Sequence, residues 1–409
     1  MTDDPVLTIE PLPDCLTNPA LNTVLQTLPT ARLVGGVVRD TLLGRAVADI
    51  DLASPLPPDA VIAALRGAGI RVVPTGMDHG TVTAIVDGHG FEITTLRRDV
   101  ETDGRHAVVA FTTDWRTDAS RRDFTINAMS MTRDGAVYDY FGGVDDLNTG
   151  IVRFVGDAAT RIAEDYLRIL RFFRFFARYG RVGPDAATLA AIHGGVPGLH
   201  RLSVERVWSE LSKILAAPDP RRAIALMETV GVIAAVVPEG AEPGRLVRLI
   251  DVGAPLDVIL RMSALLTGDP VAFAERLKLS GLERDRLVAL RHVPVPTPDA
   301  DDAALRRALA DNEGGVLVGR SWLLGGASAE WTSLRDRMAA MPRPVFPLSG
   351  RDVVAAGQPP GPTVGMVLRH VRGWWLRRGC VDDLASCREE LLRCLREGDA
   401  SASGAAAIT

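Results

Sequence analysis

Two aspartates, Asp49 and Asp51, stand at alternate positions of the short segment ADIDLAS. Side chains at i and i+2 of an extended strand point to the same side, so this spacing places two carboxylates next to each other. Carboxylate oxygens are ligands that Mg²⁺ accepts, and two such ions can activate a hydroxyl group and stabilise a leaving pyrophosphate. The pattern predicts a metal-dependent catalytic pair. For an isolated Asp-x-Asp, a solvated strand edge is the alternative.

The segment just before this pair, LVGGVVRD, adds a second feature of phosphate chemistry. Gly35 and Gly36 allow backbone N–H groups to approach a phosphate chain, and the short helix expected after them points its N-terminus to the same place. Two glycines, a short helix and then Asp-x-Asp are more specific together than either part alone. This order favours a nucleotide site.

Polar residues further along the chain could complete such a site. Glu92 lies in the strand candidate GFEITTLRRD with a phase that suits a site-facing carboxylate, although an outward-facing charge is the alternative. The segment SRRDFTINAMSM is expected to be a helix that places Asp123 and Asn127 one turn apart, where both could reach a ribose. A guanidinium group binds phosphate through charge-assisted hydrogen bonds. The candidates for binding a triphosphate in this way are Arg97, Arg98, Arg121 and Arg122.

The segment EDYLR carries a candidate base-selecting pair. Asp165 and Arg168 would be neighbours on one face of the helix expected over 161–180. A carboxylate accepts and a guanidinium donates hydrogen bonds, which matches the amino group and ring nitrogen of cytosine and adenine but not uracil or guanine. Glu164 is expected to orient Arg168 through a salt bridge, and a surface ion pair is the alternative for Asp165 and Arg168. The phenylalanines of this helix are expected in the core: Phe172, Phe173, Phe175 and Phe176.

Five motifs in order resemble the class II tRNA nucleotidyltransferase and bacterial poly(A) polymerase family: GGVVRD, DIDLAS, EITTLRRD, SRRDFTINAM and VGDAATRIAEDYLRILRFFRF. The resemblance covers residues 30–240 and implies an α+β head of the polymerase-β nucleotidyltransferase type, followed by an all-α neck, body and tail. It implies that Asp49 and Asp51 bind the metal ions, with Glu92 as a third catalytic candidate. The nucleotide-binding residues expected from these motifs are Gly35, Gly36, Arg39, Arg122, Asp123, Asn127, Arg161, Glu164, Asp165, Arg168 and Arg171.

The implied domain boundaries follow the change from a mixed pattern to helical periodicity. The head is expected over 1–150, the neck over 151–200, the body over 201–293 and a tail that contacts tRNA over 303–397. A linker rich in Pro and Asp separates body and tail.

The implied activity is the addition of CCA to the 3′ end of tRNA from CTP and ATP with Mg²⁺, two ions being expected, and release of pyrophosphate. Poly(A) polymerase on the same scaffold, and partial addition of CC or of A, stay open. The segment RRDVETDGRHAVVAF lacks an apolar period and is expected to be a mobile loop. In CCA-adding relatives a loop at this place shifts the pocket from CTP to ATP. Its charged residues here are Asp99, Glu101, Asp103 and Arg105.

Composition sets outer limits on these expectations. The chain has 409 residues, of which 47% are hydrophobic, and a formal net charge of -5, which excludes a disordered or histone-like nucleic-acid binder. No apolar run is long enough for a membrane span, and the N-terminus lacks signal-peptide features, so a cytoplasmic protein without an obligate protein partner is expected. Cys380, Cys387 and Cys394 recur near a helical heptad, which favours core packing over a zinc site.

Overall fold

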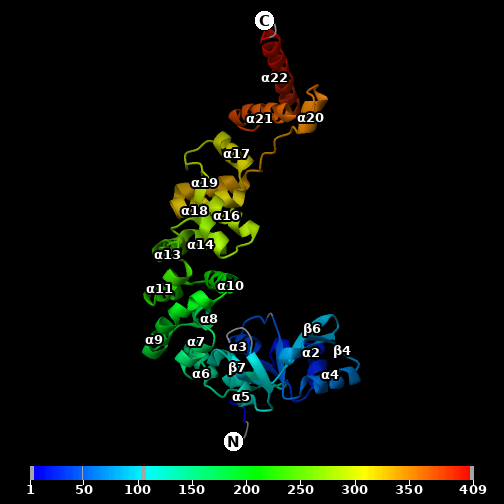
Figure 1. Cartoon of the computed structure of the whole chain (residues 1–409), viewed down its shortest axis with the longest axis vertical. Helices are drawn as coiled ribbons and strands as arrows, with labels where there is room; N and C mark the ends of the chain where they lie inside the picture. Colours follow the sequence, from blue (N-terminus) through cyan, green and yellow to red (C-terminus); the bar gives the residue numbers. More distant parts are fainter. Residues whose placement is uncertain (1–3, 48, 103–106, 406–409) are drawn as a thin grey trace. The chain divides into compact units, whose positions relative to one another are not determined.

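The computed structural model describes residues 4–47, 49–102 and 107–405, and the chain divides into two compact units after Pro238 (Figure 1). The first unit carries the strands. In the described part of the second unit, all regular elements are helices. The α+β head and the all-α region after it therefore confirm the expected fold class. The unit boundary falls inside the segment expected as the body, and the division into head, neck, body and tail stays a prediction.

The first unit is built on an eight-stranded mixed sheet and a separate two-stranded ribbon. The sheet contains β1 (Leu7–Thr8), β2 (Arg32–Val34), β3 (Asp51–Ser54), β4 (Arg71–Gly76), β5 (Thr81–Val86), β6 (His89–Thr95), β9 (Ser130–Met131) and β10 (Ala136–Tyr138). Their order is β1-β10-β9-β2-β3-β6-β5-β4, and the ribbon pairs β7 (Arg97–Thr102) with β8 (Ala107–Phe111). Among these pairs β3 and β6 are parallel, so the sheet is mostly antiparallel, as expected.

Helices of the first unit cover the sheet and then form the helical region after it. They are α1 (Asp14–Thr17), α2 (Pro19–Thr27), α3 (Gly36–Leu42), α4 (Pro58–Gly67), α5 (Trp115–Ser120), α6 (Gly143–Thr149), α7 (Ala158–Glu164), α8 (Leu167–Tyr179), α9 (Ala186–Gly195), α10 (Val204–Leu215), α11 (Arg221–Thr229) and α12 (Val232–Val236). Helices α2 and α4 pack on β5, where Val24, Leu65 and Val82 are buried. Burial of these apolar side chains stabilises β5, the neighbour of β6 in the sheet.

An aromatic cluster joins α8 to the sheet-bearing part of the first unit. The ring centroids of Phe124 and Phe154 lie 4.9 Å apart, and those of Phe124 and Phe175 lie 5.1 Å apart. Phe172 and Phe173 are fully buried in the same helix, which confirms their expected place in the core. Tilted ring pairs at these distances add to the burial energy. The cluster therefore fixes α8 beside the segment that carries Asp123.

Two expected helices differ from the structure. The helix expected over SRRDFTINAMSM does not form: α5 ends at Ser120, Phe124 pairs with Phe154 in an isolated bridge, and a short 3₁₀ turn (Thr125–Asn127) follows. The helix expected over 161–180 is broken at Asp165, whose backbone is extended (φ -155°). The Asp165 side chain accepts a hydrogen bond from the backbone N–H of Leu167, and such local hydrogen bonds compete with those of a continuous helix.

The expected mobile loop is also different in part. Residues 97–102 and 107–111 form the paired strands β7 and β8, in which Asp99 faces Val109 and Glu101 faces Val108 along the backbone. The prediction of an irregular loop is therefore wrong for these stretches. Asp103 and Arg105 lie outside the described residues.

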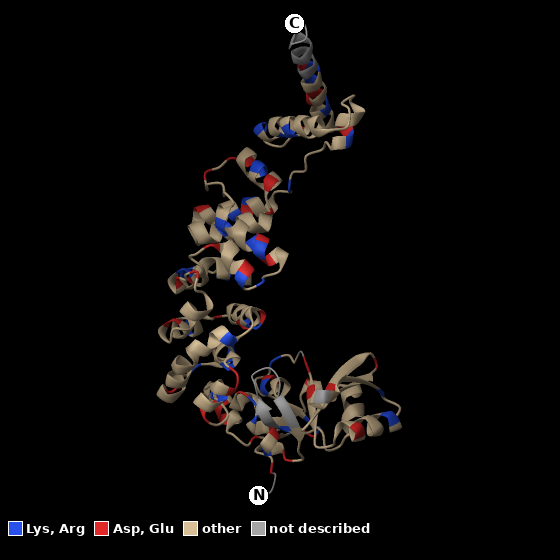
Figure 2. Ribbon diagram, viewed as in Figure 1, with Lys and Arg blue, Asp and Glu red and all other residues tan. Residues whose placement is uncertain are grey.

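The second unit consists of α13 (Pro243–Asp251), α14 (Val258–Leu265), α15 (Pro270–Arg276), α16 (Gly281–His292), α17 (Asp302–Asp311), α18 (Gly314–Gly325), α19 (Ala329–Ala340), α20 (Gly350–Ala355), α21 (Pro362–Arg377) and α22 (Leu384–Ala405). Cys380 and Cys387 are buried beside Trp375, which confirms core packing for these two thiols. Figure 2 shows acidic and basic residues intermixed on the helices of both units, in line with the small net charge. Of the helices described, not one combines the length and the apolar character needed to cross a bilayer.

Candidate active site

A pocket of about 640 Å³ opens in the first unit, lined by the β2–α3 turn, the start of β3, the segment after α5 and helices α8 and α10. Twelve of the predicted site residues line it: Gly35, Gly36, Arg39, Asp51, Arg97, Arg121, Arg122, Asp123, Asn127, Asp165, Arg168 and Arg171. The lining is rich in arginine, which suits a ligand with several negative charges. The structure thus brings together residues that are more than a hundred positions apart in the chain.

The glycine turn approaches the site as closely as expected. Gly35 has φ +74°, a conformation that favours glycine, and it connects β2 to α3. A Cβ atom at this position would lie 3.1 Å from Nη1 of Arg122. The absence of a side chain therefore lets a pocket-lining guanidinium lie against the backbone of the turn.

The carboxylates of the Asp-x-Asp motif lie at the edge of this pocket. Asp51 begins β3 and pairs in register with Glu92 of the parallel strand β6, so the expected third carboxylate is on the neighbouring strand. Asp49 lies just before the strand and is exposed, as are Asp51 and Glu92. Partial burial raises the pKa of Asp51, the charge of Asp49 raises it further, and the charge of Arg122 opposes both.

These three carboxylates offer unused oxygens. Among the described residues, the side chains of Asp49, Asp51 and Glu92 have no hydrogen-bond or ion-pair partner. Their carboxylate oxygens do not all lie within 4.8 Å of one another, because the group of described residues that meets this distance is a different one. Hard oxygen donors of like charge that form no ion pair fit a divalent ion of the Mg²⁺ type. Asp49 and Glu92 themselves are not among the pocket-lining residues.

A buried aspartate orients two of the pocket arginines. Asp118 Oδ1 accepts from Arg121 Nε at 3.0 Å, and Asp118 Oδ2 pairs with Arg122 Nη2 at 3.3 Å. Burial raises the pKa of Asp118, but the charges of Arg122 and Arg121 outweigh it and hold this pKa below its ordinary value. The aspartate is therefore ionised and fixes the arginines at the pocket wall.

Asp123 and Asn127 meet as predicted, although no helix connects them. Asp123 Oδ1 accepts from Asn127 Nδ2 at 3.1 Å, and Asp123 Oδ2 accepts from Arg171 Nε at 2.7 Å. Asn127 Oδ1 in turn accepts from Arg39 Nη1 at 2.6 Å. Burial raises the pKa of Asp123, but the Arg171 charge and the Asn127 hydrogen bond bring it below its ordinary value. This network holds the polar floor of the pocket rigid.

Asp165 lines the pocket from the break between α7 and α8 and does not belong to either helix. Its Oδ1 accepts from the backbone N–H of Leu167, the first residue of α8, at 3.0 Å, a local hydrogen bond across two residues. Its Oδ2 accepts from Arg206 Nη2 of α10 at 2.6 Å. The prediction that Asp165 and Arg168 share one helix face is therefore wrong. Both still line the same pocket.

Arg168 is fixed by the partner that the sequence predicted. It pairs with Glu164 across the break, and its Nη1 donates to the carbonyl of Arg161 at 2.7 Å. Arg161 also binds Glu164, through Nη1 at 2.6 Å, and its Nη2 donates to the carbonyl of Arg122 at 2.9 Å. The expected orientation of Arg168 by Glu164 is confirmed. Arg161 and Glu164 lie behind the pocket lining and support it.

Three lining residues have no assigned role in the sequence-based site: Leu167, Phe175 and Arg206. Phe175 was assigned to the core, and it is buried as well as pocket-lining. Arg206 lies 41 residues after its partner Asp165, so no local spacing connects the two. The one available signal was its place in RLSVERVWSELSKIL, a stretch inside the region of family resemblance.

Comparison with known families and proteins agrees with this geometry. Residues 31–153 match the model described as "Poly A polymerase head domain". Residues 184–242 match the one described as "Probable RNA and SrmB- binding site of polymerase A". Asp51, Glu92 and Asp123 lie within the first match, and Arg206 lies within the second.

Full-length relatives cover most of the chain. The "CCA tRNA nucleotidyltransferase 1, mitochondrial" of Homo sapiens is 38% identical over 364 residues, which cover 85% of this chain and 83% of the relative. A "CCA-adding enzyme" of Levilactobacillus brevis is 32% identical over 372 residues, 86% of this chain and 91% of the relative.

A solved structure of this kind is also similar throughout. The crystal structure of the Bacillus stearothermophilus CCA-adding enzyme in complex with CTP matches with a TM-score of 0.73 and 26% identity, covering 94% of this chain and all of that one. With this similarity in sequence and in fold, the chain belongs to the family of class II CCA-adding tRNA nucleotidyltransferases.

Proposed function

We propose that this protein adds CCA to the 3′ end of tRNA from CTP and ATP and releases pyrophosphate. The observation that carries the proposal is one pocket that contains both the Asp51 carboxylate and the polar pair of Asp165 and Arg168. The first suits phosphoryl chemistry, and the second suits recognition of a base. Relatives similar over most of the chain are named as enzymes of this activity.

Asp49 and Asp51, with Glu92 on the neighbouring strand, are the residues that would hold the divalent ions, which we propose to be Mg²⁺ and two in number. Bound there, the ions would supply activation of the RNA 3′ hydroxyl and neutralisation of charge on the leaving pyrophosphate. The unpartnered oxygens and the raised pKa of Asp51 support this assignment, because a nearby cation would relieve the repulsion between the two aspartates.

The pocket arginines would hold the triphosphate. Arg121 and Arg122 are oriented by Asp118, and Arg171 is oriented by Asp123. A guanidinium that is already fixed loses little side-chain entropy when it binds phosphate, so this arrangement favours a single phosphate position. Asn127, held by Arg39 and Asp123, lies where a sugar would enter the pocket.

Base choice would come from the hydrogen-bonding groups that remain on the selecting pair. Arg168 uses Nη1 for Glu164 and the Arg161 carbonyl, and Nη2 has no hydrogen bond to a described residue. Each oxygen of Asp165 accepts one hydrogen bond and keeps capacity for another. The pair can therefore donate to a ring nitrogen and accept from an amino group. Uracil and guanine would leave these groups unpaired.

Poly(A) polymerase and partial addition of CC or A are the other activities that this scaffold could support. They are not favoured, because relatives matched over 85% and 86% of this chain are named for CCA addition. The segment around Asp99, Glu101, Asp103 and Arg105 is proposed to shift the pocket from CTP to ATP. Deleting residues 100–106 is then expected to allow two cytidines and prevent the final adenosine, as read on a sequencing gel.

The decisive experiment is incubation of the protein with tRNA that lacks its 3′ end, with each nucleoside triphosphate alone and in mixtures. CTP alone is expected to add two nucleotides, and CTP with ATP three. Continued growth with ATP would instead indicate a poly(A) polymerase, and arrest after CC or dependence on a CC end would indicate a partial enzyme. We propose a cytoplasmic location and no obligate protein partner, whereas the human relative is named as mitochondrial.

A further inference from the structure

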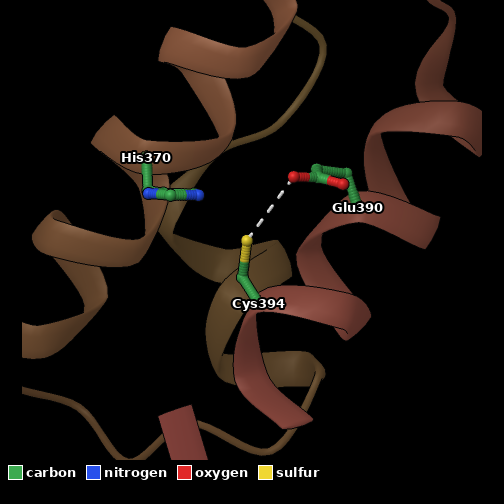
Figure 3. A group of neighbouring side chains, drawn as sticks. All are labelled: His370, Glu390 and Cys394. Carbon is green, nitrogen blue, oxygen red and sulfur yellow. Dashed lines mark hydrogen bonds between the residues drawn. The ribbon is translucent and has the colours of Figure 1, made fainter. Parts of the chain in front are cut away.

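The second unit contains a cluster of metal-ligating side chains far from the nucleotide chemistry in sequence. Ligand atoms of His370, Glu390 and Cys394 all lie within 4.8 Å of one another (Figure 3). Of all groups of three or more His, Cys, Asp and Glu among the described residues, this is the one that meets that distance. Figure 3 shows the three side chains directed into the space between two helices.

The helices that carry these residues place them on facing surfaces. His370 lies on α21, whereas Glu390 and Cys394 are four residues apart on α22 and so share one helix face. Helices α21 and α22 contact each other in the core cluster that contains Trp375 and Cys387, and Cys394 packs at its edge. Their separation is thus set by apolar packing and not by the ligand residues themselves.

Glu390 is a buried carboxylate whose orientation is already fixed. Its side chain is only 6% exposed, and Arg393 binds both of its oxygens, with Nε 2.8 Å from Oε2 and Nη2 2.6 Å from Oε1. Cys394 Sγ lies 3.8 Å from the same Oε1. Each carboxylate oxygen has a second lone pair, and ligating carboxylates are commonly held by such an outer hydrogen bond.

We propose that His370, Glu390 and Cys394 form a binding site for a divalent transition-metal ion of the zinc type, which links α21 to α22. Nitrogen, oxygen and sulfur donors in one set suit Zn²⁺ and Co²⁺ and do not suit Mg²⁺, which prefers oxygen alone. Three protein ligands leave a fourth position for water. The site is independent of the proposed nucleotidyl transfer and uses none of its residues.

The present geometry needs only a small adjustment to hold an ion. Zinc ligands lie about 2.0–2.3 Å from the metal in a tetrahedral arrangement, so two ligand atoms of one ion are about 3.3–3.8 Å apart. The ligand atoms here lie within 4.8 Å of one another and would have to approach by about 1 Å. Because His370 is exposed, its ring can rotate inward without moving the core. Cys394 would bind the ion as a thiolate, so binding would release the thiol proton to solvent.

This inference changes one expectation from the sequence. The heptad spacing of the cysteines favoured core packing for all three, and that holds for Cys380 and Cys387. Cys394 differs because it is only half-buried and faces a histidine from another helix. No spacing within one helix could reveal that neighbour.

Cobalt binding to the full-length protein tests the proposal. The chelator-treated, reduced protein is titrated with Co²⁺ while the thiolate-to-cobalt charge-transfer absorption is recorded, and Zn²⁺ is then added. We expect one saturable thiolate band that Zn²⁺ abolishes. Asp49 and Asp51 cannot produce this band, because they offer only oxygen ligands.

Variants assign the band to the three residues. Cys394→Ser should abolish it, and His370→Asn, at an exposed position that does not threaten folding, should weaken Co²⁺ binding at least about tenfold. Cys15→Ser is the matched control, since Cys15 is also half-buried, and its Sγ lies 3.5 Å from Thr41 Oγ1 in the first unit. Absence of the band from the wild type, its persistence in Cys394→Ser, or unchanged affinity in His370→Asn would each overturn the proposal.

Discussion

On the sheet, Asp51 lines the pocket and Asp49 and Glu92 lie near it in sequence or strand register, and all three are exposed. Their side chains have no hydrogen-bond or ion-pair partner among the described residues. On the other side, Asp123 and Asp165 each accept hydrogen bonds on both carboxylate oxygens. The pKa values follow the same contrast. That of Asp51 is raised by burial and by Asp49, and that of Asp123 is lowered by Arg171 and Asn127 against the effect of its burial.

The contrast separates two uses of a carboxylate. A group that is to bind a cation keeps its oxygens available and tolerates repulsion from its neighbour, because the cation relieves that repulsion. A group that is to recognise a base or hold a positioning arginine must have one orientation before the substrate arrives. Substitutions on the two sides should therefore differ in kind: loss of catalysis with intact folding on the sheet side, and loss of specificity or stability on the other.

The largest effect is expected for Asp51→Asn. Removal of one ligand of the proposed metal site should cost several kcal/mol of transition-state stabilisation, a fall in kcat of about a thousandfold or more. Stability should be unchanged or slightly increased, because a raised pKa means that the folded protein favours the uncharged side chain. Single-turnover addition of CMP to tRNA and a urea unfolding curve measure the two quantities.

Asp59→Asn is the control for this variant, since Asp59 is an exposed aspartate in the first turn of α4 and does not line the pocket. It should retain the wild-type rate. A rate for Asp51→Asn above about a tenth of wild type, less than 1.4 kcal/mol in the barrier, would contradict the proposed metal ligand.

The next largest effect is expected for Arg168→Ala. With the guanidinium absent, the ring-nitrogen acceptor of cytosine loses its donor, and UTP should no longer be penalised for lacking that acceptor. We expect the preference of kcat/KM for CTP over UTP to fall about a hundredfold, close to 2.7 kcal/mol. Arg66→Ala, at an exposed position in the last turn of α4, is the matched control. Equal losses with CTP and UTP would show that Arg168 is structural.

A smaller, thermodynamic effect is expected for Asp123→Asn. The pair that it forms with Arg171 is buried at the aspartate and one-third exposed at the arginine, so its loss should lower the free energy of unfolding by about 2 kcal/mol near pH 7. Since the folded pKa of Asp123 is lowered, this stabilisation exists above the ordinary pKa of about 3.9 and disappears as the pH falls through the lower folded value. The difference between wild type and variant in urea unfolding should therefore be constant near neutral pH and shrink only as the pH falls below the ordinary aspartate value. A constant difference across the range would exclude the charge as its cause.

The segments predicted most accurately from the sequence are those in which residue types alternate with the two-residue period of a strand. The position of Asp51 on β3 and of Glu92 on the adjacent strand follows from period-two spacing, and the structure pairs them directly. The glycine turn before α3 was predictable for a similar reason, since Gly35 requires φ > 0. The strand spacing and the glycine turn each depend on residues close in sequence, whereas the pairing of β3 with β6 joins distant segments.

The helical side was harder because apolar periodicity does not report a single broken turn. Ile162, Ile169 and Phe173 keep a helical spacing across the break at Asp165, so the pattern predicts one helix where the structure has two. Asp165 lies two residues before the first residue of α8, and its side chain accepts from the Leu167 N–H. An aspartate can break a helix through such a local hydrogen bond, but the apolar periodicity of the segment predicts no break. Its other partner, Arg206, comes from α10 and has no local signal at all.

The smallest effect is expected for Arg206→Gln, and it tests whether Asp165 needs a fixed orientation. Arg206 touches the Asp165 carboxylate at Oδ2, and the Leu167 N–H holds Oδ1 independently. Loss of one of two restraints should let the carboxylate rotate, so that the CTP-over-UTP preference falls about tenfold, near 1.4 kcal/mol. Arg206→Lys, which keeps a donor and a charge, should restore part of it. Because the Arg206 side chain is 31% exposed, little loss of folding stability is expected, and a urea midpoint close to wild type serves as the control.

If the variant lowers kcat/KM equally for both nucleotides, Arg206 shapes the pocket as a whole. If the preference for CTP over UTP does not change, the Leu167 N–H alone is sufficient to orient the Asp165 carboxylate, and that orientation does not depend on α10.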